Sequence, residues 1–102
     1  MPLLEVCPLA ELPTGSSTTI EGEERIAVFH TDDDEFYATS DTCTHEEWSL
    51  GEDSDLEGCE VVCPLHMARF DLRTGKPLCL PALVALKTYD VRVEDGTIYV
   101  IA

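Results

Sequence analysis

Two short motifs constrain this chain more than any other feature, because each pairs a cysteine with a histidine. The first is Cys43-Thr44-His45 and the second is Cys63-Pro64-Leu65-His66. At these spacings one tight loop can direct both side chains toward one point, and residues 46–62 are enough for the chain to run out along a strand and return. A lone cysteine or histidine usually belongs to the core or the surface. Four at paired spacings predict a metal centre with two sulfur and two nitrogen ligands.

The order of these ligands distinguishes two kinds of centre. A structural zinc ion accepts such a set, but its usual order places the two cysteines together and the two histidines together. Here each motif contributes one of each, which suits a 2Fe–2S cluster of the Rieske type, in which two histidines replace two cysteines on one iron. We therefore expect one such cluster, with the ligands Cys43, His45, Cys63 and His66. A zinc-stabilised interaction module is the alternative.

The sequence around both motifs resembles the two cluster loops of Rieske ferredoxins. The resemblance rests on residues 43–50 and 63–66 and on two later stretches, 69–77 and 79–82. It is strongest to the ferredoxin components of multicomponent aromatic-ring-hydroxylating dioxygenases of the biphenyl, benzene and toluene type. The resemblance implies an all-β Rieske fold, in which an antiparallel β-sandwich base domain carries an inserted cluster-binding subdomain.

Period-two patterns and frequent turn signals independently predict an all-β chain. We expect a single domain over residues 1–102, with a base formed by residues 1–40 and 83–102 and a cluster-binding subdomain at about 41–82. The predicted strands and hairpins are 3–7, a hairpin of 17–21 with 25–30, then 35–39, 60–62, and a hairpin of 91–93 with 98–101 around Asp95-Gly96.

Two further local expectations concern polar stretches. Residues 51–58 are acidic and rich in turn formers, which predicts an exposed loop. His30 ends a predicted strand beside the acidic turn 31–34, and we expect it to lie on the surface.

The composition limits the partners. A formal net charge of −15 disfavours nucleic acid and anionic membranes, and it favours basic partner surfaces and salt-sensitive encounters. The first residues contain no basic region and no long apolar run, and no stretch approaches a membrane span. We therefore expect a cytoplasmic monomer.

Three of the five cysteines lie outside the two motifs. They are Cys7, Cys59 and Cys79, and we expect each to be a small buried hydrophobic residue. Cys59 precedes Cys63 by four residues, but it falls outside both motifs and beside a glycine, so we do not assign it as a ligand.

Residues near the ligands suggest how the centre is covered and tuned. Glu46, Glu47, Trp48 and Pro81 are predicted to form a docking rim, and Met67 is predicted to add to the apolar cover. By resemblance, high-potential Rieske proteins carry a Ser and a Tyr, each with a hydroxyl group, at the positions that match Ala68 and Phe70. Neither Ala68 nor Phe70 has a hydroxyl group. We therefore expect a reduction potential near the lower end of the range of roughly −150 to +300 mV for Rieske centres.

The resemblance implies a function in electron transfer rather than catalysis. By resemblance, Cys43 and Cys63 bind the inner iron, and His45 and His66 bind the outer iron that takes the extra electron. The implied donor is an NADH-dependent flavoprotein reductase, and the implied acceptor is a terminal Rieske oxygenase. No P-loop, dinucleotide-binding motif or Ser-His-Asp set is evident in the sequence. The alternative to a ferredoxin is a small Rieske subunit of a nitrite reductase-type enzyme.

Overall fold

Two antiparallel sheets make up the fold. The computed structural model describes residues 3–22, 24–42, 49–52, 54–63, 68–78 and 85–101. Over these ranges a six-stranded sheet has the strand order β1-β9-β8-β4-β3-β2, and a three-stranded sheet has the order β5-β6-β7. A short 3-10 helix, η1 (Leu9–Glu11), is the helical element of the described ranges. The prediction of an all-β chain is confirmed.

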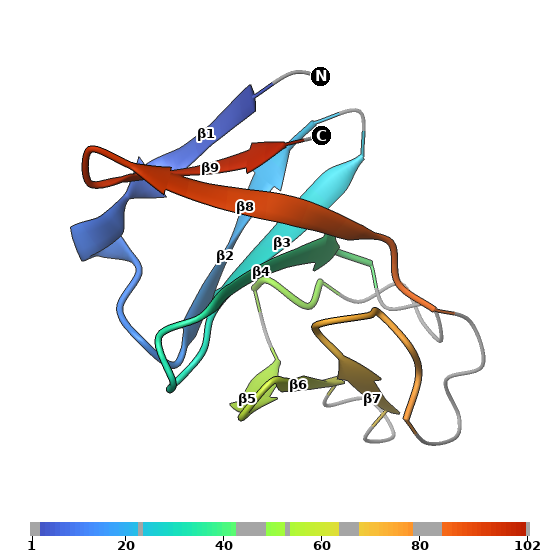
Figure 1. The fold of residues 1–102 in the computed structure, drawn as a ribbon. Helices are drawn as coiled ribbons and strands as arrows, with labels where there is room; N and C mark the ends of the chain where they lie inside the picture. The colour runs from blue at the N-terminus through green and yellow to red at the C-terminus, as the bar shows by residue number, and fades with distance from the viewer. Residues whose placement is uncertain are drawn as a thin grey trace.

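The two sheets draw on different parts of the chain. The larger sheet contains β1 (Leu3–Pro8), β2 (Ser16–Glu21), β3 (Arg25–His30), β4 (Phe36–Ser40), β8 (Thr88–Glu94) and β9 (Thr97–Ile101). The smaller sheet contains β5 (Asp55–Glu57), β6 (Glu60–Cys63) and β7 (Ala68–Asp71). Figure 1 shows the smaller sheet beside β3 and β4 of the larger one, at the end of the molecule away from β1 and β9. The proposed domain boundaries themselves stay a prediction.

Both predicted hairpins are present in the larger sheet. Strands β2 and β3 pair from Ser16↔His30 to Glu21↔Arg25. Strands β8 and β9 meet at a two-residue turn in which Asp95 and Gly96 both have positive φ, 50° and 76°. Two central residues with positive φ define the type I′ turn, whose twist matches that of paired strands.

The expectation of an exposed loop over residues 51–58 is wrong in two places. Gly51 is buried, and residues 55–57 form β5, which pairs with β6. Three residues are too few to show a period-two pattern in the sequence. The strand forms because its central residue, Leu56, packs against the buried core of the smaller sheet.

The expectation that His30 lies on the surface is also wrong. Its exposed fraction is 5%, and its ring stacks on Phe36 with centroids 4.0 Å apart. Its Nδ1 lies 2.7 Å from the carbonyl oxygen of Leu12, and its Nε2 lies 2.6 Å from Oδ1 of Asp34. The acidic turn that suggested exposure instead supplies a hydrogen-bond partner, which a buried polar side chain requires.

Strand β3 lies at the centre of the molecule, because its alternate residues belong to two apolar cores. Ala27 and Phe29 face a core shared with the smaller sheet, while Ile26 and Val28 face a second core beneath β1 and β9. We call the first the inter-sheet core, and its buried members are Ala27, Phe29, Leu50, Val61, Cys63, Ala68, Phe70, Leu72 and Leu86. Since successive side chains of a strand point to opposite faces, one strand can connect both cores.

A close approach between two backbones fastens the turn after β7 to the segment that leads into β8. Gly75 has a φ of +77°, and a Cβ atom added there would overlap the carbonyl oxygen of Leu86. The amide of Leu86 donates a hydrogen bond to the carbonyl oxygen of Gly75, 2.8 Å away. Both the positive φ and the lack of space require glycine at this position.

Substituting Gly75 and Gly96 by alanine separates these two requirements, because both have nearly the same φ but only Gly75 lacks space. Gly96→Ala should lower the free energy of unfolding by about 1–2 kcal/mol, the cost of a left-handed alanine. Gly75→Ala should lower it by a further 1–3 kcal/mol or so, because the Cβ atom displaces Leu86. Urea denaturation of the two variants measures the difference. Equal losses would show that the contact with Leu86 does not constrain the chain.

Candidate metal centre

One of the four predicted ligands lies within the described residues. It is Cys63, whereas Cys43, His45 and His66 lie outside them. The predicted docking and covering residues also lie outside them, namely Glu46, Glu47, Trp48, Met67 and Pro81. Within the described ranges, no three His, Cys, Asp or Glu side chains gather in a way that would hold a metal ion. Cys63 and the residues that flank the other three predicted ligands therefore define the described part of the site.

Cys63 is fully buried at the end of β6. It lies opposite Ala68, the first residue of β7, and the next inward-facing pair is Val61 with Phe70. All four residues belong to the inter-sheet core. A buried thiolate is costly unless it is paired or coordinates a metal. The position of Cys63 therefore suits a ligand whose charge is taken up by iron, and residues 64–67 are the connection between two paired strands.

The two ends of the first predicted loop lie side by side in space. Thr42 and Ser49 form a β-bridge. The amide of Leu50 donates to the carbonyl oxygen of Asp41 over 2.9 Å, and the amide of Gly51 donates to Oδ1 of Asp41 over 2.8 Å. Leu50 is buried in the same core as Cys63. The base of the loop that carries Cys43 and His45 is thus fixed to the core that holds Cys63.

The segment 79–84, which carries the predicted covering residue Pro81, is flanked in a similar way. Before it, the amide of Leu78 donates to the carbonyl oxygen of Arg69 over 2.8 Å, and Pro77 bridges to Phe70. After it, Leu86 is buried in the inter-sheet core. The flanks of all three segments that contain predicted site residues therefore meet at one core, which fits a single centre bound by both motifs.

The outward face of the smaller sheet is acidic. Arg69 forms ion pairs with Glu57 and Glu60, each at 3.2 Å. The hydrogen bonds that Arg69 donates, first to Glu57 and then to Glu60, raise the pKa of its guanidinium. Asp55, the first residue of β5, is also exposed. Two carboxylates share one guanidinium here and Asp55 adds a third negative charge, so this face attracts a basic surface.

Two of the cysteines outside the motifs are less buried than predicted. Cys7 and Cys59 are both half-buried, while Cys79 lies outside the described residues. Cys7 lies on the edge strand β1, where the register to β9 shifts, and burial followed by the charge of Glu11 raises the pKa of its thiol. Cys59 lies in the turn between β5 and β6. An edge strand and a turn each leave one side of a residue open to solvent.

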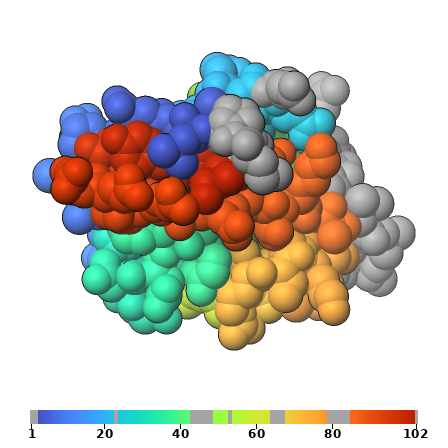
Figure 2. All heavy atoms as spheres, turned by 45° about the horizontal axis from the view of Figure 1, so that its top comes forward, coloured from blue at the N-terminus to red at the C-terminus, as the bar shows by residue number. Residues whose placement is uncertain are grey.

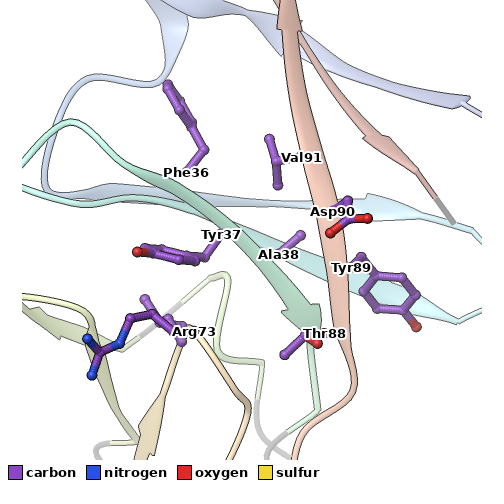
Figure 3. Close-up of a pocket in the computed structure, with 9 residues that line it drawn as sticks. Phe36, Tyr37, Ala38, Arg73, Thr88, Tyr89, Asp90 and Val91 are labelled. Atoms are coloured by element: carbon purple, nitrogen blue, oxygen red, sulfur yellow. The ribbon is translucent and has the colours of Figure 1, made fainter.

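A surface hollow of about 350 Å³ lies between the two sheets. In Figure 2, residues of the β3–β4 turn and of 71–78 lie side by side below β8. Figure 3 shows Tyr37 and Arg73 on one side of the hollow and Tyr89 and Asp90 on the other. The Arg73 guanidinium already forms an ion pair with Asp71 at 3.0 Å. Tyr37 and Leu72, which line the hollow, also pack in the inter-sheet core that contains Cys63.

Sequence reasoning missed two residues at the base of the first loop, Asp41 and Gly51. The motifs and strand patterns do not single out Asp41, although Asp side chains commonly bond to backbone amides near turns. Gly51 was assigned to an exposed loop, yet a Cβ atom there would overlap Cγ2 of Thr19. The signal available in the sequence is an aspartate that follows a predicted strand and precedes a ligand.

Comparisons with known proteins agree with this geometry. The model of the Rieske [2Fe-2S] domain family matches residues 3–90. The chain is 49% identical over 100 residues to the 3-phenylpropionate/cinnamic acid dioxygenase ferredoxin subunit of Photorhabdus laumondii, which covers 98% of this chain and 94% of that protein. None of the helices in the described residues is long and apolar enough to span a membrane.

Solved structures are similar over nearly the full length. The ferredoxin of carbazole 1,9a-dioxygenase from Nocardioides aromaticivorans IC177 has a TM-score of 0.88 and 34% identity, with 98% of this chain and 97% of that chain covered. A chain in the complex of reduced oxygenase and oxidized ferredoxin in carbazole 1,9a-dioxygenase has a TM-score of 0.87 and 37% identity, with 96% and 91% covered. The predicted Rieske fold is confirmed, which sets aside the zinc-binding alternative. The chain belongs to the Rieske [2Fe-2S] family, and its cofactor is one Rieske-type 2Fe–2S cluster.

Proposed function

We propose that this protein is the ferredoxin of an aromatic-ring dioxygenase system. It takes one electron from an NADH-dependent flavoprotein reductase and passes it to a terminal Rieske oxygenase. Its similarity to a dioxygenase ferredoxin subunit over nearly the full length of both chains carries this proposal. Because the donor uses NADH, we assign the electron exchange to the cytoplasm. We assign the carrier as a monomer. Its base consists of residues 1–40 and 83–102, and its cluster-binding subdomain of residues of about 41–82.

The proposed ligands are Cys43, His45, Cys63 and His66. When bound, the cluster supplies reversible one-electron chemistry, with the two thiolates on one iron and the two imidazoles on the other. The chain itself holds the Cys63 sulfur in a dry environment, since Cys63 and its neighbours across the β6–β7 pair are fully buried. As a ligand, Cys63 is a thiolate in a water-excluded position, and the iron of the cluster supplies the cationic partner that such a group requires.

The low potential expected from the sequence has structural support. Ala68 and Phe70 are both fully buried, Ala68 lies opposite Cys63 in the strand register, and neither has a hydroxyl group. Hydrogen bonds to the sulfur atoms are one of the means by which proteins raise the potential of such clusters. We therefore assign the potential to the lower end of the Rieske range.

The proposed docking rim consists of Glu46, Glu47, Trp48 and Pro81, with Met67 as part of the cover. The acidic outward face of the smaller sheet adds further negative charge to the protein surface. A carrier must dock and leave quickly, and small interfaces guided by charge allow this. Both partners are accordingly expected to present basic surfaces.

Replacing Cys63 by alanine should abolish the cluster, while the same change at Cys59 should not. The wild-type protein should be red-brown, with two irons and two acid-labile sulfides per chain and a reduced electron paramagnetic resonance signal of low average g. Cys63→Ala should lose this signal, whereas Cys59→Ala should keep both the metal content and the spectrum. Loss of iron from both variants would contradict the assignment of Cys63 as a specific ligand, and a colourless wild-type protein would refute the proposed function.

Reversing the charge at Glu46 and Glu47 should slow reduction by the flavoprotein reductase. At an ionic strength of about 0.01 M we expect a decrease of several-fold in the rate, which should shrink near 0.5 M because salt screens exposed charges. The control reverses Asp90 and Glu94, two exposed residues of β8, and changes the net charge equally. Stopped-flow kinetics measures both. If the control slows the reaction as much as the test variant, net charge rather than the rim guides docking.

A further inference from the structure

A buried carboxylate fixes the base of the first ligand loop. The Asp41 side chain is 2% exposed, and its Oδ1 accepts a hydrogen bond from the amide of Gly51 over 2.8 Å. The Asp41 amide donates to the carbonyl oxygen of Arg25 over 2.9 Å, and the Asp41 carbonyl accepts from Leu50 over 2.9 Å. Asp41 thus joins strand β3 to Leu50 and Gly51, which follow the loop.

Gly51 is held against the edge strand β2 from the opposite side. Ser17 donates its hydroxyl hydrogen bond to the carbonyl oxygen of Gly51 over 2.9 Å. A Cβ atom at Gly51 would overlap Cγ2 of Thr19 and would lie 2.7 Å from the carbonyl oxygen of Thr18. The backbone at Gly51 therefore has little freedom, and the carboxylate of Asp41 bonds to an amide that cannot easily move away.

The charge of Asp41 is only partly offset. Among the described residues, the cation paired with Asp41 is Arg25, whose Nε lies 3.9 Å from Oδ2 of Asp41, beyond hydrogen-bond distance. The same guanidinium pairs with Glu52 at 2.7 Å and with Glu21 at 3.5 Å, and its side chain is 41% exposed. Three carboxylates share one guanidinium, and only that of Asp41 is buried. A buried charge is screened much less than an exposed one.

We propose that Asp41 is a positioning residue for Cys43 and His45, and that its buried negative charge lowers the reduction potential of the centre while Arg25 opposes it. The inference rests on the proposed ligand set. Asp41 precedes Cys43 by two residues, so the covalent chain keeps its charge close to the first ligand. Adding an electron near a poorly screened negative charge is unfavourable, which makes the reduced state harder to reach.

Two isosteric or near-isosteric variants of the purified holoprotein test the electrostatic part. Asp41→Asn keeps an oxygen that accepts from Gly51 but removes the charge, so the potential measured by voltammetry should rise. Arg25→Gln removes the opposing charge, so the potential should fall. Asp95→Asn and Arg92→Gln are matched controls, because both residues are exposed, Arg92 on β8 and Asp95 in the β8–β9 turn. Their potentials should stay close to that of the wild type.

The positioning part has a separate readout, the rate at which iron is lost to a chelator. Asp41→Ala leaves the buried amide of Gly51 without its acceptor, so iron release should be roughly tenfold faster than in Asp41→Asn. Should Asp41→Ala fail to fold, the opposite shifts of Asp41→Asn and Arg25→Gln still decide the question, because simple loosening of the loop would move both potentials in the same direction.

The outcomes are distinct. Opposite shifts at Asp41 and Arg25, with unchanged controls, support the inference. Unchanged potentials, or shifts of one sign in both variants, overturn it and leave the proposed ferredoxin function intact. A wild-type protein without iron and sulfide overturns the proposed function itself.

Discussion

The inter-sheet core is the constraint on which the rest of the structure depends. It joins Ala27 and Phe29 of the larger sheet to Val61, Cys63 and Phe70 of the smaller one. Full burial of side chains such as Phe29 and Phe70 stabilises the fold by about 1.5–3 kcal/mol each. Without this contact, a three-stranded sheet with strands of three and four residues would be too small to be stable alone. The sulfur of Cys63 is therefore positioned by the same packing that holds the two sheets together.

Polar contacts complement this packing at the base of the first loop. Apolar contacts bury Leu50, but they do not by themselves set the direction of the backbone on either side of residues 43–48. The hydrogen bonds of Asp41 to Gly51, Leu50 and Arg25 do so. A buried carboxylate is costly unless its oxygens have partners, so Asp41 specifies one arrangement of these backbones. Rigid support of this kind suits a redox site, because the reorganisation energy of electron transfer is lower when the ligands move little between the oxidised and reduced states.

The acidic character of the surface has a consequence for encounters rather than for the fold. Where charges pair, as in Arg69 with Glu57 and Glu60, the pairs are partly exposed and contribute little stability. The exposed carboxylates of the β3–β4 turn instead give the protein a long-range field. An electron carrier benefits from this separation, because partners can be attracted and released without disturbing the core that holds the ligands.

The sequence by itself determined the chemistry of the centre and the local structure of the chain. Two Cys/His motifs, the run of apolar residues in 25–30 and the Asp95-Gly96 turn are local patterns, and ligand side chains, short apolar runs and turn residues can be read without knowing distant residues. Only the tertiary structure decided burial, since burial depends on which distant segments cover a residue. His30 is buried because Leu12 and Asp34 supply its partners, β5 forms because Leu56 meets the core, and Asp41 becomes a support for the first loop because Gly51 returns beside it.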